Sequence, residues 1–138
     1  MIEVEVFGVD AAPHSPRAQE AIPRLEEIRR LCTLATDFAG VSQGHLAIEF
    51  VDAQRIAELN LQHRSLPKPT DVLSFPIDGA EPVQGGRELG DVVICIEHTA
   101  DVREAIVHGV LHLLGMDHET DGGEMLELQR ELLAQEPT

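Results

Sequence analysis

Three histidines lie close together between residues 108 and 118, in the segment His-Gly-Val-Leu-His-Leu-Leu-Gly-Met-Asp-His. On a helix, residues four apart are separated by about 40° around the axis and about 6 Å along it, so His108 and His112 project from one face. Gly115 suits the end of such a helix and a sharp turn that brings His118 back as a third ligand. Three imidazoles leave the fourth position of a tetrahedral metal open for water, which is typical of a catalytic site.

The spacing of these histidines predicts a chemistry as well as a ligand set. An isolated His pair at helical spacing is more often structural than metal-binding, but the third histidine and the glycine of the turn favour a metal here. A metal-bound water ionises near neutral pH and becomes a nucleophile. We expect one transition-metal ion, zinc in the first place, although three imidazoles also suit nickel, cobalt or iron.

One alternative is a zinc metalloprotease, because His-x-x-x-His-x-x-Gly-x-x-His is also the ligand spacing of the metzincins. Those proteases need a glutamate directly after the first histidine as the general base for peptide hydrolysis. That position is Gly109 in this chain, and Asp117 is better interpreted as a residue that shapes the turn or orients a ligand. The missing carboxylate disfavours proteolysis, and the metzincin-like protease remains the alternative.

The elements that must position these histidines follow from hydrophobic periodicity and from turn residues. Asp52 is a candidate helix N-cap, and Pro23 suits the first turn of a helix. Residues 91–96 are nearly all apolar, which predicts a central strand covered on both faces. The element order predicts an α+β fold: a single domain with a small mixed β-sheet packed with helices, and the metal site on a helix of the C-terminal half and the turn after it. The expected strands are 2–7, 45–51, 72–75 and 91–96, the expected helices are 17–38, 53–63, 101–114 and 121–133, and 78–88 is expected as a surface loop.

Length and charge set limits on function. The chain has 138 residues, which suits one domain over 1–138. Its net charge is −15 and Lys68 is its one lysine, which by itself argues against a nucleic-acid-binding protein. No apolar run approaches the roughly 20 residues needed to span a bilayer, and acidic residues stand where a signal peptide has basic ones. We therefore expect a cytoplasmic protein without membrane association, in which Cys32 and Cys95 are reduced, buried residues.

Further motifs stand in a fixed order around the histidine segment. They are Asn60-Leu-Gln-His-Arg64, Pro69-Thr-Asp-Val-Leu-Ser-Phe-Pro76, Leu89-Gly-Asp-Val-Val-Ile94 and Glu124-Met-x-x-Leu-Gln. Together with the histidines they closely resemble the YbeY family of bacterial rRNA maturation factors, over most of residues 45–135. The chain departs from the family pattern at His63 and Met116, and its connection between Ile96 and His108 is shorter than usual, which should alter one wall of the site and not the ligands.

The resemblance implies a metal-dependent endoribonuclease that acts on single-stranded RNA, in 16S rRNA 3′-end processing and ribosome quality control. It also implies rRNA, the small ribosomal subunit and assembly factors as partners, and no DNA. His108, His112 and His118 match the family's metal ligands, and Arg64 matches its characteristic arginine. We predict Arg64 and His108 as catalytic residues, because a guanidinium fits phosphate and stabilises transition-state charge. A non-catalytic ribosome-assembly factor with a structural metal is a second alternative.

The remaining polar residues near these motifs are expected to have mainly structural or electrostatic roles. With the metal, Arg64 and Lys68 would form a local positive patch in a negative field, which predicts weak binding to free RNA. Asp91 either orients a loop or takes part in catalysis, and the sequence leaves both open. Thr70 and Asp71 suit a turn before a strand, Ser74 is expected to face the site, and His14, His45 and His98 are expected to be exposed or capping residues.

Overall fold

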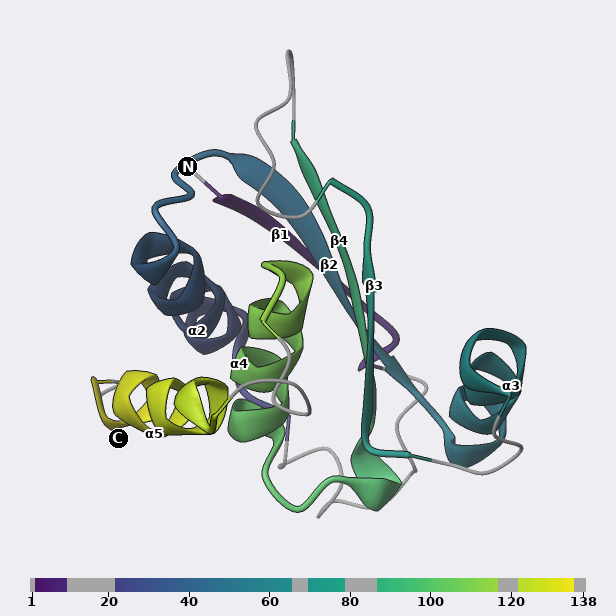
Figure 1. The fold of residues 1–138 in the computed structure, drawn as a ribbon. Helices are drawn as coiled ribbons and strands as arrows, with labels where there is room; N and C mark the ends of the chain where they lie inside the picture. The colour runs from purple at the N-terminus through teal and green to yellow at the C-terminus, as the bar shows by residue number, and fades with distance from the viewer. Residues whose placement is uncertain (1, 10–21, 66–69, 79–86, 117–121, 136–138) are drawn as a thin grey trace.

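The four strands form one mixed sheet in the order β1-β2-β4-β3. A computed structural model of the chain describes residues 2–9, 22–65, 70–78, 87–116 and 122–135 (Figure 1). β1 pairs with β2 and β2 with β4 in parallel, while β3 is an antiparallel edge strand on β4. The bounds are β1 (Ile2–Phe7), α2 (Leu25–Phe38), β2 (Gly44–Val51), α3 (Ala53–Arg64), β3 (Val72–Pro76), β4 (Glu88–Cys95), the 3₁₀ turn η2 (Ile96–His98), α4 (Val102–Leu113) and α5 (Glu124–Gln135).

The two faces of the sheet are covered unequally. Helices α2, α4 and α5 pack on one face, and α3 lies on the other (Figure 1). In β4, Val92 and Ile94 belong to the large core under the three helices, whereas Val93 and Cys95 belong to a small cluster under α3. This alternation is what a central strand with both faces covered requires. We call the two sides the three-helix face and the α3 face.

Most of the predicted elements are confirmed, and their ends are corrected. Pro23 does not lie in the first turn of a helix, because Arg24 is the N-cap of α2 and the helix begins at Leu25. The predicted residues 17–21 of that helix lie outside the described residues. β4 begins at Glu88, inside the segment predicted as a loop, and ends at Cys95 because Ile96 begins a 3₁₀ turn. The last helix begins at Glu124, later than predicted.

The predicted α+β class is confirmed by this arrangement of one mixed sheet and helices. The Asp52 cap of α3 is confirmed as well, since its Oδ1 accepts a hydrogen bond from the Arg55 N–H at 2.8 Å. Cys32 and Cys95 are free thiols and both are buried. Burial raises the pKa of the Cys32 thiol to about 12, which makes it unreactive at neutral pH. Among the described helices, none is long and apolar enough to cross a membrane.

Candidate metal centre

Helix α4 carries the first two predicted ligands, and both of its ends are defined by local chemistry. The Asp101 carboxylate accepts hydrogen bonds from the backbone N–H groups of Arg103 and Glu104, at 3.0 and 3.3 Å. Gly115 has a φ of +96°, a conformation that L side chains rarely adopt, and its N–H donates to the His112 carbonyl. The helix therefore ends just before Gly115, whose positive φ permits the chain to turn there, as the sequence predicted.

His108 and His112 point their Nε2 atoms at each other. The two atoms are 3.2 Å apart, and the rings are nearly perpendicular with centroids 4.7 Å apart. Two imidazole nitrogens bound to one tetrahedral zinc at about 2.0–2.1 Å would be separated by about 3.3 Å. Both side chains are half-buried, so their ring nitrogens are shielded while access from solvent remains. The pair fits two ligands of a single metal ion.

The other ring nitrogen of His108 is held by Gln129, the last residue of the Glu124-Met-x-x-Leu-Gln motif, to which the sequence assigned no role. Gln129 of α5 is 4% exposed, and its Oε1 lies 2.8 Å from His108 Nδ1. A sequence signal for it exists: Gln129 interrupts the otherwise apolar stripe of α5 formed by Met125, Leu128 and Leu132. A polar residue on a buried helical face generally has a partner to satisfy.

Gly109, directly after the first histidine, lies where α4 packs closely against the sheet. A Cβ added at Gly109 would lie 2.4 Å from Val92 Cγ1 and 3.1 Å from Val92 Cγ2. The Ser74 hydroxyl of β3 donates a hydrogen bond to the Gly109 carbonyl at 3.0 Å, which ties α4 to the edge strand. A protease-type glutamate has no room at this position, so the packing explains why the metzincin alternative is disfavoured. The Ser74 side chain points to the side of the sheet on which α4 and the predicted site lie.

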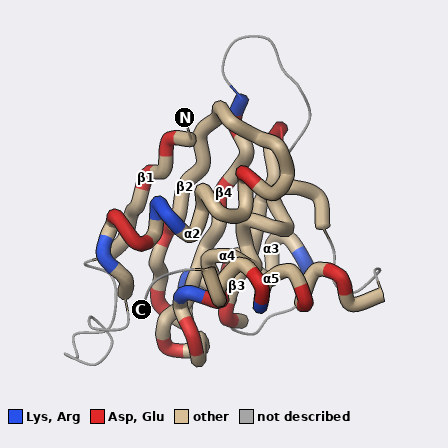
Figure 2. Tube along the Cα trace, turned by 90° about the vertical axis from the view of Figure 1, so that its left-hand side faces the viewer, with Lys and Arg blue, Asp and Glu red and all other residues tan. Residues whose placement is uncertain are grey.

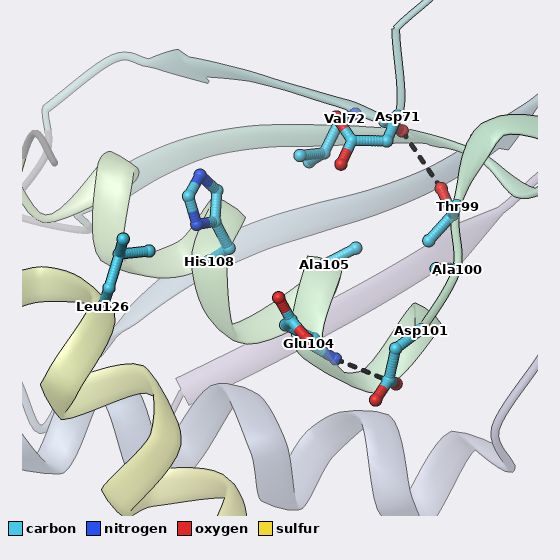
Figure 3. A pocket seen from close by; sticks show the side chains of 9 residues that line it. All are labelled: Asp71, Val72, Thr99, Ala100, Asp101, Glu104, Ala105, His108 and Leu126. Carbon is cyan, nitrogen blue, oxygen red and sulfur yellow. Dashed lines mark hydrogen bonds between the residues drawn. The ribbon is translucent and has the colours of Figure 1, made fainter. Parts of the chain in front are cut away.

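A cavity of about 160 Å³ lies beside His108 (Figure 3). Its walls come from the start of β3, the connection after η2, the first half of α4 and one residue of α5. One wall of the cavity is formed by residues of the connection between Ile96 and His108, which the sequence indicated to be shorter than is usual in the resembling family. Three carboxylates contribute to the lining, beside Thr99, His108 and four apolar residues. The lining residues are Asp71, Val72, Thr99, Ala100, Asp101, Glu104, Ala105, His108 and Leu126.

Arg64 is not brought next to the histidines. It is the exposed last residue of α3, which packs on the α3 face, whereas α4 packs on the three-helix face. No described contact joins the Arg64 side chain to His108 or His112. The predicted residues His14, Lys68, Asp117 and His118 lie outside the described residues. Within the described ranges no third metal-ligating side chain joins the histidine pair.

The other polar residues singled out in the sequence have structural positions. Asp71 accepts the N–H of Val72 at 2.8 Å and the hydroxyl of Thr70, as a turn before β3 requires. Asp91 alternates with Val92 and therefore lies on the α3 face, away from the histidines. His98 is exposed at the end of η2, as predicted. His45 was also predicted to be exposed or capping, and that prediction is wrong.

His45 is half-buried and bridges two carboxylates from neighbouring strands. Its Nδ1 lies 2.8 Å from Glu88 of β4, and its Nε2 lies 2.7 Å from Glu5 of β1. The hydrogen bond to Glu88, with that to Glu5, raises the pKa of His45 above its ordinary value. His45 is therefore a cross-strand ion-pair residue, neither exposed nor capping.

Acidic residues predominate along the described chain, as Figure 2 shows for strands and helices alike. Two of the described arginines are paired with glutamates: Arg103 with Glu27 of α2 at 2.8 Å and Arg55 with Glu58 at 3.4 Å. Positive charge for an anionic ligand must therefore come from a few positions. A metal ion at the histidines would be one of them.

The fold has a counterpart among solved structures. The chain is similar to the solution structure of TM1509 from Thermotoga maritima, with a TM-score of 0.52, 24% sequence identity, and coverage of 94% of this chain and 86% of that one. At this identity the likeness shows the fold alone. It places the sheet and helices described above in a known α+β class of protein.

Sequence relatives then show the family. Residues 17–136 match the model of the family described as Endoribonuclease YbeY. A protein named Endoribonuclease YbeY from Aquifex aeolicus is 40% identical over 121 residues, which cover 79% of each chain. Proteins of the same name from Bifidobacterium adolescentis and Acinetobacter baumannii are 42% and 46% identical, over 67% and 64% of this chain and 61% and 68% of theirs. The chain belongs to the Endoribonuclease YbeY family, which confirms the predicted resemblance and the predicted enzyme class, a hydrolytic endoribonuclease.

Proposed function

We propose that this chain is a metal-dependent endoribonuclease that cleaves single-stranded RNA during rRNA maturation, at a centre built from His108, His112 and His118. The observation that carries the proposal is the 3.2 Å approach of the two Nε2 atoms, in a chain of an endoribonuclease family. Zinc is the first candidate metal and nickel the second. The proposal extends to 16S rRNA 3′-end processing and ribosome quality control, with the small ribosomal subunit and its assembly factors as partners.

The chain's own part in this chemistry is to hold the ligands in place. A metal ion held by these histidines would polarise a phosphoryl oxygen and supply a water with a pKa near 7 as nucleophile. His108 and His112 present their ring nitrogens from one helical face, and the Asp101 cap and the Ser74 hydrogen bond secure that helix. A rigid ligand helix favours catalysis because misplacement of reacting groups by about 1 Å can cost two orders of magnitude in rate.

The cavity beside His108 gives the RNA a place next to this centre. The carboxylates of Asp71, Asp101 and Glu104 line it, and they would repel a phosphate. We therefore place the scissile phosphate on the histidine side and the nucleoside part toward the cavity. The same negative charge favours weak affinity for free RNA and reliance on ribosomal partners for targeting.

Arg64 is proposed to hold the RNA backbone. Its guanidinium suits bidentate contact with a phosphate, and it is exposed at the end of α3. Its place on the α3 face favours contact with a nucleotide away from the scissile bond. Arg64→Ala should then raise KM more than it lowers kcat, with metal content unchanged. A loss confined to kcat would instead assign Arg64 to the reacting phosphate, and an unchanged KM and kcat would remove it from the site.

The decisive experiment combines metal analysis with cleavage of an rRNA 3′-end fragment. We expect about one metal ion per chain, loss of cleavage on chelation, recovery on adding zinc, and unchanged circular dichroism throughout. His112→Ala should lose both metal and cleavage, while His98→Ala, a matched exposed histidine outside the centre, should lose neither. Unfolding on chelation would point to a structural metal in an assembly factor. Cleavage of casein in place of RNA would favour the protease.

A further inference from the structure

We propose that Gln129 is a positioning residue of the metal centre, which holds His108 in the tautomer whose Nε2 can bind a metal. The contact that carries the proposal is the 2.8 Å approach of Gln129 Oε1 to His108 Nδ1, between α5 and α4. The tautomer follows from the hydrogen bond with the Gln129 amide oxygen facing His108, whereas its functional meaning rests on the proposed metal site.

Burial makes this contact more than a surface hydrogen bond. Among the described residues only Thr36, Asn60 and Gln129 are polar and buried, and Gln129 is 4% exposed. A buried primary amide costs free energy unless it is hydrogen-bonded, so an apolar residue at this position of the α5 stripe would stabilise the fold at least as well. Thr36, by contrast, donates to the Thr33 carbonyl of its own helix. Gln129 instead uses its amide on a predicted ligand of another helix.

The direction of the hydrogen bond determines which nitrogen of His108 keeps a lone pair. A neutral imidazole has one N–H and one acceptor nitrogen, and an amide oxygen can only accept. Facing Gln129 Oε1, His108 Nδ1 must therefore carry the proton, which leaves Nε2 as the acceptor. That Nε2 is the atom directed at His112 Nε2, 3.2 Å away. A partner on the distal nitrogen also orients the ring, and removing such partners from metal sites typically lowers metal affinity about 10–100-fold.

The opposite orientation of the amide makes the opposite prediction. If the Gln129 NH₂ faced His108, it would donate to Nδ1, and the proton of His108 would reside on Nε2, which could then not bind a metal. Two substitutions separate these cases. Gln129→Glu keeps only acceptors, and Gln129→Met keeps the length and the apolar stem without any acceptor. Leu132→Met, one turn further along the same buried face of α5, is the matched control for repacking.

The test begins with the metal-free native protein, where ¹⁵N NMR of the imidazoles at a pH that keeps them neutral reports the tautomer of His108 directly. We expect a proton on Nδ1 in native protein, in Gln129→Glu and in Leu132→Met, and a shift toward Nε2 in Gln129→Met. Competition with a chromophoric chelator should then show zinc affinity lowered about 10–100-fold in Gln129→Met. Gln129→Glu should retain it, and melting curves should show that the variants are folded.

The outcomes separate this proposal from the proposed function. A proton on Nε2 of His108 in the native protein overturns the role of Gln129, whatever the variants do, and so does native zinc affinity in Gln129→Met. If zinc binds but RNA is not cleaved, the function fails while the NMR result still decides the role of Gln129. If the native tautomer is the expected one and the affinity falls only in Gln129→Met, the role of Gln129 is established.

Discussion

The two faces of the sheet differ in the size of the core that covers them. On the three-helix face, one large core extends from Val4 of β1 to Leu132 of α5, and the histidine pair lies at its surface. On the α3 face, a small cluster of Val51, Ile56 and its neighbours supports a single helix. The remainder of that face carries charged residues, among them the His45 bridge between Glu5 and Glu88.

The difference shows where this fold needs rigidity. A helix that carries two predicted ligands of one ion must not move, and α4 is packed against β3, β4, α2 and α5. Helix α3, which carries Arg64, contacts little more than β4 and the edge strand. Local stability follows the number of buried apolar contacts, so α3 should open more readily than α4. We therefore expect the same kind of substitution to have larger consequences on the three-helix face.

The largest expected effect comes from cavities in the two clusters. Leu111 of α4 and Ile56 of α3 are both fully buried. Leu111→Ala should lower the free energy of unfolding by about 2–5 kcal/mol. Ile56→Ala should cost toward the lower end of that range, because its cluster is small and can collapse into the gap. Urea denaturation of both variants measures the two costs. An equal or larger cost for Ile56→Ala would contradict the contrast between the faces.

Gly109→Ala tests the close approach of α4 to the sheet. The new methyl group would overlap Val92, at a cost of about 1–3 kcal/mol that the better helix propensity of alanine reduces by about 1 kcal/mol. We expect a net loss of about 0–2 kcal/mol and weaker zinc binding, because α4 must shift. Adding Val92→Ala should recover part of both losses by making room for the methyl group. If the two substitutions are simply additive, the proposed overlap is not the cause.

The aspartate N-caps of α3 and α4 allow the same substitution to be compared on the two faces of the sheet. Asp52→Ala removes the cap of α3, and Asp101→Ala removes the cap of α4. Each should cost about 1 kcal/mol in denaturation experiments. Zinc affinity should fall in Asp101→Ala only, because α4, unlike α3, carries two of the predicted ligands. Equal zinc affinity in the two variants would show that the cap does not position the histidines.

The smallest effect concerns His45 and depends on pH. Because Glu88 and Glu5 raise its pKa in the folded state, protonated His45 stabilises the fold fully below its unfolded pKa of about 6.5. That contribution is lost as the pH rises through the higher folded value. His45→Gln should therefore be less stable than native protein at pH 5.5, by at most about 1 kcal/mol for such a partly exposed pair. Denaturation curves should converge at alkaline pH, and a gap that widened with pH would reverse the assignment.

Local patterns in the sequence were sufficient for most of the elements and for the shared helical face of His108 and His112. Alternation in residues 2–7 defines β1, the apolar run in 91–96 defines the central strand, and Asp52 and Gly115 mark helix ends. These features depend on neighbours within about one turn or one strand, which is why periodicity reveals them. The same holds for His108 and His112, because i and i+4 share a helical face wherever the helix lies.

Contacts between residues far apart in the chain were decided only by the tertiary structure. Gln129 meets His108 because α5 packs on α4. His45 meets Glu88 because the parallel register of β2 and β4 places them opposite each other, and it reaches Glu5, two residues beyond its β1 partner Glu3. Arg64 matches a family motif, yet the fold puts its helix on the face away from the histidines. No local pattern encodes which faces of distant elements meet. The packing of the whole core determines that, and with it the partners of each predicted site residue.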